Sequence, residues 1–174
     1  MTSLVHVAGF DPGLSGGAAL VRHQSGRPPI ILRTLRFRAL DGPGGKRKVL
    51  DARGLVNWLG GDGPRIDVAC IESVTAMPKQ GVSTTFTFGA ATGALEAIVL
   101  ACSGAATVEW IRPATWKRQM KLGSDKHAAM DKAGLLFGAA AAKQHWPLRL
   151  DSGVAEAALL ARWYCVFRLG HADT

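Results

Sequence analysis

The chain contains few of the residues on which several common classes of protein depend. Its three cysteines, Cys70, Cys102 and Cys165, each lie in an apolar run, and none has the CxxC spacing of a zinc site. We therefore expect neither a disulfide framework nor a structural zinc, but buried free thiols in a reducing cytoplasm. No apolar run approaches the ~20 residues of a membrane span, so no membrane association is expected.

Acidic residues are also scarce, with 13 against 21 lysines and arginines, which gives a net charge of +8. This balance favours an anionic partner such as nucleic acid. The chain has no Gly-x-x-x-x-Gly-Lys-Ser/Thr phosphate loop, so no nucleotide cofactor is expected. A length of 174 residues, 48% of them hydrophobic, fits one compact domain over residues 1–174 with a buried core.

Apolar periodicity and turn residues predict alternating strands and helices. Strands are expected over 4–10, 18–22, 30–37, 66–71 and 106–111, and helices over 51–59, 86–101, 113–120, 126–142 and 152–169. The Gly-rich basic segment 41–48 is expected to be a loop. This order predicts an α/β fold, a mixed five-stranded sheet flanked by helices.

Three acidic residues occupy positions typical of a metal site. Asp11 follows the apolar run VHVAGF and Glu72 follows IDVACI. If these strands are parallel neighbours, both carboxylates emerge at one edge of the sheet, where open α/β sheets place their sites. Glu156 lies within VAEAALLARW and shares a helical face with Leu160 and Trp163, so it points toward the core. Such carboxylates are the oxygen ligands that Mg²⁺ prefers.

Each acid also has a purely structural interpretation. Asp11 could form an Asx-turn, and Glu72 could pair with an arginine. Asp151 and Glu156 could serve the start of the last helix, one as its cap and one as a first-turn charge. Several carboxylates buried together repel one another, and a metal ion relieves that cost, so the set as a whole favours a metal site.

An ordered series of short motifs resembles the RuvC-type Holliday-junction resolvases of bacteria, phages and chloroplasts, a branch of the RNase H-like superfamily. The resemblance covers nearly the whole chain, in order. The motifs are GFDPGLSGG from Gly9, IES from Ile71, AMPKQGVS from Ala76, FTFG from Phe86, RPATWK from Arg112, WPL from Trp146 and DSGVAEA from Asp151.

The resemblance implies an RNase H-like nuclease that acts as a homodimer and resolves four-way DNA junctions by metal-dependent paired nicking. It implies two Mg²⁺ or Mn²⁺ ions per site, and a bacterial or phage-infected cytoplasm. The residues that it implies as metal ligands and catalytic groups are Asp11, Glu72, Asp151 and Glu156. DNA contacts are expected from Lys79, Lys117, Arg118 and Lys126. Phe86 is a further candidate DNA contact, although an aromatic residue at the start of a helix more often packs in the core.

The final motif departs from the family pattern. Ser152 stands where relatives commonly carry an acid or a histidine, four places before Glu156. Residues five apart on a helix differ by about 140° around its axis. Asp151 could therefore join Glu156 at a metal only from a turn before the helix. Alternatively Asp151 caps the helix, and the site consists of Asp11, Glu72 and Glu156.

Three other functions compete with a junction resolvase. Ser152 suggests a catalytically weakened protein that binds junctions without cutting them. Another RNase H-like nuclease would use the same carboxylates on a different substrate. A phosphotransferase of the actin and sugar-kinase type has a similar glycine-rich loop, but it needs two such domains, and this chain is too short for both.

Overall fold

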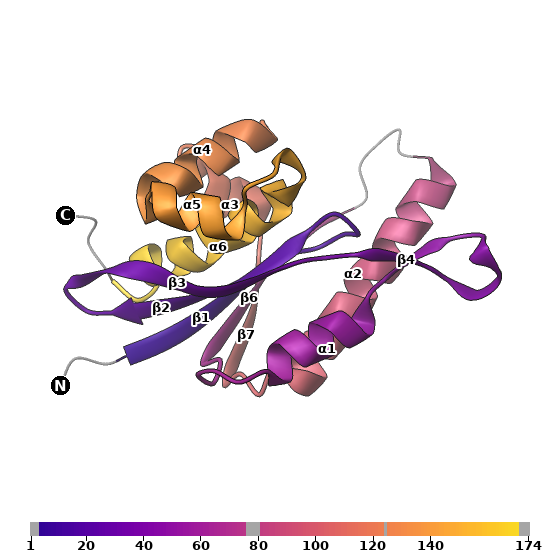
Figure 1. Cartoon of the computed structure of the whole chain (residues 1–174), viewed down its shortest axis with the longest axis horizontal. Coiled ribbons are helices and arrows are strands. Elements are labelled where there is room, and N and C mark those ends of the chain that lie inside the picture. Colours follow the sequence, from indigo (N-terminus) through magenta and orange to yellow (C-terminus); the bar gives the residue numbers. More distant parts are fainter. Residues whose placement is uncertain (1–3, 76–80, 124, 171–174) are drawn as a thin grey trace.

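The computed structural model describes residues 4–75, 81–123 and 125–170 and is organised around one five-stranded sheet (Figure 1). The central strand is β1 (Leu4–Asp11). On one side β2 (Gly17–Gln24) and β3 (Arg27–Arg36) pair antiparallel, and on the other β6 (Val68–Glu72) and β7 (Thr107–Ile111) run parallel to β1. The order β3-β2-β1-β6-β7 confirms the predicted mixed five-stranded sheet.

Helices cover both faces of this sheet (Figure 1). On one face lie α3 (Pro113–Gln119), α4 (Lys126–Phe137), α5 (Ala139–His145) and α6 (Ser152–Phe167), with the 3-10 turn η2 (Arg149–Asp151) leading into α6. On the other lie α1 (Ala52–Gly60) and α2 (Val82–Cys102). The single helix predicted over 126–142 is wrong, because Gly138 adopts a φ of +91° and divides it into α4 and α5.

The buried strands alternate between the two helical layers. Val7 packs in the hydrophobic cluster that contains α6, whereas Ala8 and Phe10 pack in the cluster that contains α1 and α2. In β6, Cys70 belongs to the first cluster and Ile71 to the second. Since successive strand residues point to opposite faces, a strand buried on both sides reads as the continuous apolar run seen in the sequence.

Close backbone contacts fix α6 against the sheet. A Cβ atom at Gly9 would overlap the carbonyl oxygen of Ala157, so only glycine allows this approach of α6 to β1. At the start of the helix, a Cβ at Gly153 would lie 2.6 Å from the Cα of Gly16. Every residue from Ser152 to Cys165 is buried. The position of α6 is therefore set by its backbone as well as by its side chains.

The segment expected to be a loop forms a two-stranded hairpin instead. Strands β4 (Ala39–Asp41) and β5 (Lys48–Leu50) pair antiparallel and are joined through the short 3-10 turn η1 (Pro43–Gly45). Gly44 and Gly45 both have positive φ, which lets the chain reverse. The hairpin projects beside α2, away from the main sheet (Figure 1).

Helix α2 is only partly covered by the rest of the protein. Ala91, Leu95 and Val99 are buried, but Val82 is 88% exposed and Leu100 is 57% exposed. Contrary to the sequence expectation, this 21-residue helix is long and apolar enough to cross a membrane by length and composition alone, a test that core helices of soluble proteins also pass. Its last residue, Cys102, is exposed, so burial of all three thiols is also wrong.

Candidate metal centre

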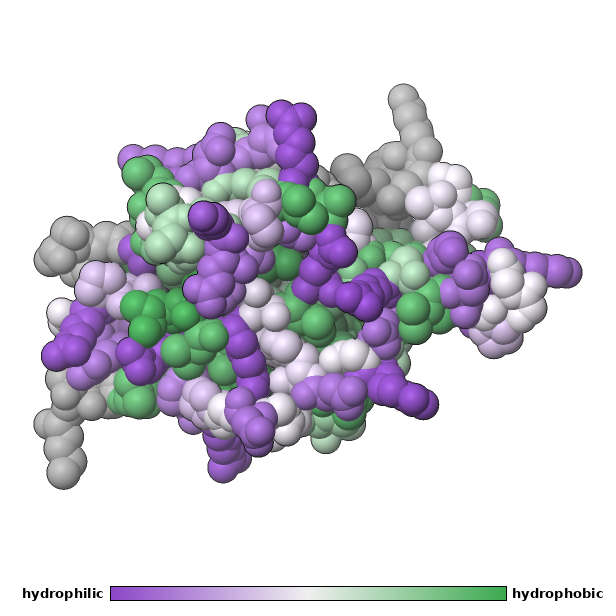
Figure 2. All heavy atoms as spheres, viewed as in Figure 1, coloured by the Kyte–Doolittle hydropathy of each residue, from purple (hydrophilic) through white to green (hydrophobic). Residues whose placement is uncertain are grey.

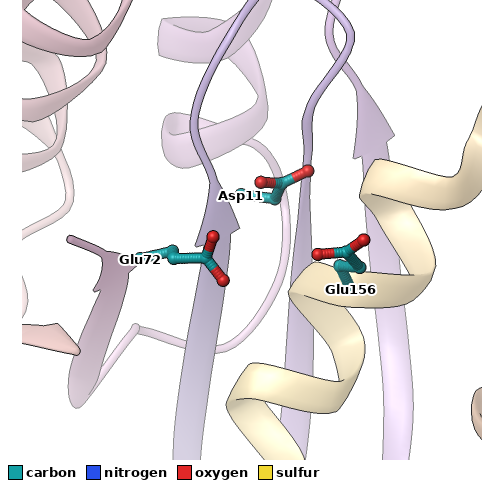
Figure 3. A group of neighbouring side chains, drawn as sticks. All are labelled: Asp11, Glu72 and Glu156. Atoms are coloured by element: carbon teal, nitrogen blue, oxygen red, sulfur yellow. The ribbon is translucent and has the colours of Figure 1, made fainter. Parts of the chain in front are cut away.

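Three carboxylates converge at the C-terminal edge of the parallel strands (Figure 3). Asp11 ends β1, Glu72 ends β6, and Glu156 lies on the first turns of α6. One oxygen of each carboxylate lies within 4.8 Å of the other two. The structure thus brings together three of the four predicted metal ligands from three distant parts of the chain.

Strand alternation explains why these side chains meet. The parallel register pairs Phe10 with Ile71, so Asp11 and Glu72 lie side by side one residue further on. Val7 and Cys70 both face the α6 layer. Asp11 lies four residues after Val7 and Glu72 two residues after Cys70, so each points to the same side of the sheet as its partner. Both carboxylates therefore point toward α6, on the side that carries Glu156.

Burial gives the cluster unusual electrostatics. Glu72 and Glu156 are each 7% exposed, whereas Asp11 is half-buried. Burial raises the pKa of Glu72, and the nearby charge of Glu156 raises it further, while Lys117 and the hydrogen bond from Trp116 act in the opposite direction. Negative charge concentrated in this way attracts a cation.

A lysine currently supplies part of the compensating positive charge. Lys117 Nζ lies 2.6 Å from Glu156 Oε2 and 3.8 Å from Glu72 Oε2. Burial lowers the pKa of Lys117, but the hydrogen bond that it donates to Glu156 and the charges of Glu72, Glu156 and Asp11 outweigh that effect, so the pKa is raised. The ammonium group also lies 5.2 Å from the centre of the Trp116 ring.

Trp116 fixes the orientation of one carboxylate. It is fully buried, and its indole Nε1 donates a hydrogen bond to Glu72 Oε2 over 2.7 Å. Trp116 lies within the RPATWK motif, but the motif alone gives it no chemical role. The sequence does contain a signal for such a role. A buried indole N–H requires an acceptor, and Trp116 directly precedes Lys117, a predicted site residue. That acceptor lies 44 residues away, which periodicity does not show.

Asp151, the fourth predicted ligand, is held elsewhere. Its Oδ2 accepts a hydrogen bond from the backbone N–H of Leu148 over 2.9 Å, and its Oδ1 lies 3.4 Å from a guanidinium nitrogen of Arg36 on β3. It is buried in η2, just before α6. The geometry therefore gives Asp151 a structural role at the start of α6, and its participation in metal binding stays a prediction. Ser152, beside it, is also buried.

The carboxylates lie in an open cleft of about 1100 Å³ that also contains basic side chains. Lys117, Arg118 and Lys121 line it, and Arg118 and Lys121 are exposed. Phe88 forms part of the wall and would lie 3.1 Å from a Cβ at Gly13. The cleft thus combines acidic groups at its base with cations on one wall.

The other three residues that were predicted to contact DNA are Lys79, Lys126 and Phe86. Lys79 lies outside the described residues. Lys126 is the first residue of α4, and its side chain is not among those that the structure describes. Phe86 is 62% exposed, which excludes the alternative of core packing, and it lies beside Arg47 of the β4–β5 hairpin.

The donor set fits a hard divalent cation. Three carboxylates from rigid elements offer oxygen ligands with net negative charge, and Mg²⁺ or a similar ion prefers oxygen ligands. No histidine or cysteine joins the group among the described residues, so a softer ion such as zinc is a poorer match. Lys117 shows that a positive charge is accommodated at Glu72 and Glu156.

Fold and site together define an α/β protein with an RNase H-like fold and a candidate metal centre. Neither a scan against models of protein families nor a search of curated protein sequences finds a match to this chain. Among solved structures, the chain is similar to the structure of RuvC from Thermus thermophilus, with a TM-score of 0.56 over 97% of this chain and 99% of that chain. At 15% sequence identity this similarity is one of fold, and it confirms the RuvC-like fold that the sequence motifs implied.

Proposed function

We propose that the protein is a metal-dependent endodeoxyribonuclease that resolves four-way DNA junctions by paired nicking, and that Asp11, Glu72 and Glu156 hold its Mg²⁺ or Mn²⁺. The observation that carries the proposal is the convergence of these three carboxylates within 4.8 Å, on a RuvC-like fold. The basic wall of the cleft and the net charge of +8 support a nucleic-acid substrate.

The chain's own residues prepare the site for a phosphodiester. Arg118 and Lys121 attract the phosphate backbone to the cleft by charge. Trp116 donates a hydrogen bond to one oxygen of Glu72 and so fixes the orientation of the whole carboxylate, including the other oxygen. When bound, divalent ions would lower the pKa of a water molecule for in-line attack and stabilise the leaving oxygen.

Lys117 has a second role in this proposal. Its ammonium group offsets part of the negative charge of Glu156 and Glu72 before any cation arrives, which reduces the repulsion between the carboxylates. Its side chain is only partly buried and borders the open cleft, so it can turn to a phosphate oxygen once the carboxylates are otherwise neutralised. This shift would exchange an internal ion pair for a contact with substrate.

We propose a homodimer because a four-way junction presents two symmetric strands, and a two-fold assembly presents two identical sites. The exposed apolar side of α2, which includes Val82 and Leu100, is a suitable contact surface. A dimer contact at α2 would also explain why this long, apolar helix is mostly uncovered within one chain.

Nicking of synthetic substrates tests the proposal directly. A labelled four-way junction, a linear duplex and an RNA–DNA hybrid of equal length would be incubated with and without Mg²⁺. We expect metal-dependent cuts in the junction that Asp11→Asn and Glu72→Gln abolish, while both variants still bind the junction. Cleavage of the hybrid alone would favour a general RNase H, and binding without cleavage would favour the junction-binding alternative.

A further inference from the structure

The β4–β5 hairpin carries a basic surface that the proposed metal centre does not use. Residues 38–48, which include Arg38 directly before β4, contain four basic side chains and one acid, and all five are exposed. Lys48 Nζ pairs with Asp41 over 2.7 Å. In the part of the chain that the structure describes, Lys46 and Arg47 form no ion pair, so their charge faces solvent. Figure 2 shows hydrophilic side chains around the tip of this hairpin, at the right-hand end of the molecule.

Arg47 is held against an exposed aromatic ring. Its guanidinium carbon lies 5.7 Å from the centre of the Phe86 ring, at the start of α2. Phe86 is 62% exposed, so the guanidinium of Arg47 covers part of a ring that otherwise faces water. The ring restricts the rotamers of Arg47, so less conformational entropy is lost when the guanidinium binds a phosphate.

The first turns of α2 connect this surface to the metal cleft. Phe86 and Phe88 are two residues apart, which places their side chains about 200° apart around the helix. Phe88 lines the cleft, whereas Phe86 faces the hairpin. The hairpin and the cleft therefore lie on opposite sides of the same helical turn, and a polyanion that leaves the cleft across α2 would reach Lys46 and Arg47.

We infer that the β4–β5 hairpin is a second DNA-contact surface, in which Lys46 and Arg47, with Arg47 braced by Phe86, bind the phosphate backbone of a DNA segment outside the cleft. The inference rests on the proposed function, because the hairpin would contact the same DNA molecule that occupies the cleft. Charge complementarity and position select duplex DNA over an acidic protein. The contact is to backbone phosphates and carries no sequence preference.

Binding measured without metal tests the hairpin separately from catalysis. Fluorescence anisotropy would follow a labelled four-way junction in EDTA at several salt concentrations. The variants are a Lys46→Ala/Arg47→Ala double substitution, Phe86→Leu, and a Lys132→Ala/Lys143→Ala control that removes the same charge from α4 and α5. We expect the hairpin double variant to reduce the slope of log K against log salt by about 1.8, the loss of two phosphate contacts.

The control double variant should keep the wild-type slope, and Phe86→Leu should weaken binding several-fold because Arg47 loses its brace. Equal slopes for the hairpin and control variants would overturn the inference. Absence of nicking by the wild-type protein in a separate assay with Mg²⁺ would contradict the proposed function and leave the hairpin measurement intact. An unchanged affinity of Phe86→Leu would contradict the bracing of Arg47.

Discussion

The indole Nε1 of Trp116 donates a hydrogen bond to Glu72 Oε2 over 2.7 Å, and both side chains are buried. This bond joins the first turn of α3 to the end of β6, next to the three-carboxylate cluster. Groups that hydrogen-bond to metal ligands fix their orientation and commonly change metal affinity by about 10- to 100-fold when removed. Trp116 is therefore expected to position Glu72 for a metal ion.

Trp116→Phe tests this role, because it keeps an aromatic ring and removes only the N–H donor. We expect Mn²⁺ affinity, measured by titration calorimetry, to fall about tenfold. Stability should fall by about 1–3 kcal/mol, since a buried carboxylate oxygen loses its hydrogen-bond donor. Trp163→Phe is the matched control, because Trp163 is equally buried and donates to Gln119 over 2.6 Å, away from the carboxylates. A similar loss of affinity in both variants would contradict the positioning role.

The stability of the metal-free protein should depend on pH through Glu72. Its pKa in the folded protein is raised above 4.5, so the folded state holds this proton more tightly than the unfolded state. That contribution to stability is fully present below about pH 4.5 and is lost as the pH rises through the raised pKa.

Glu72→Gln mimics the protonated side chain at every pH. In EDTA the variant should therefore be more stable than the wild type at pH 7, and the difference should approach zero near pH 4.5. Urea unfolding across this range measures it. A difference between the two proteins that does not change with pH would show that charge on Glu72 is not its cause.

Asp151 and Glu156 should respond differently to isosteric substitution. Asp151→Asn removes an ion pair with the half-exposed Arg36, which contributes at most about 1 kcal/mol, and the amide oxygen still accepts from Leu148. We expect near-normal nicking and metal binding for this variant, and loss of both for Glu156→Gln. Should Asp151→Asn reduce the nicking rate by orders of magnitude, Asp151 belongs with the metal ligands.

Gly9→Ala should damage both the fold and the site, because its Cβ would overlap the Ala157 carbonyl oxygen and force α6 away from β1. We expect a loss of about 3 kcal/mol or more, measured by urea unfolding, together with weaker Mn²⁺ binding. Gly60→Ala is the control, because nothing lies within 4 Å of its Cβ position at the exposed end of α1, away from the proposed dimer surface. It should gain up to about 1 kcal/mol from helix propensity. Equal stabilities would exclude the close contact.

The proposed dimer predicts that a charge on α2 dissociates the protein. Leu100 is 57% exposed, so Leu100→Glu should yield a monomer in sedimentation equilibrium at micromolar concentration, and paired cuts should become independent single nicks. Leu135→Glu is the control, since Leu135 is 78% exposed on α4. A wild-type monomer that still makes paired cuts would contradict the dimer.

The sequence was informative where a signal is local. Apolar runs that end in an acid predicted Asp11 and Glu72, and the apolar helix around Glu156 predicted its inward direction. The hydrogen bond of Trp116 and the ion pair of Arg36 with Asp151 join residues 44 and 115 positions apart, and no periodicity encodes them. The break at Gly138 was missed because glycine is tolerated within a helical pattern and marks an end only by its observed φ.

The origin of the three carboxylates in distant segments has a consequence for biosynthesis. A nascent chain that has reached residue 150 contains all five strands of the main sheet but neither α6 nor Glu156. It also lacks the helix that fills one of the two hydrophobic clusters. The candidate metal centre is therefore assembled only after α6 has emerged and docked against Gly9. Until then, a ribosome-bound chain carries the basic side chains of the cleft without the complete set of carboxylates.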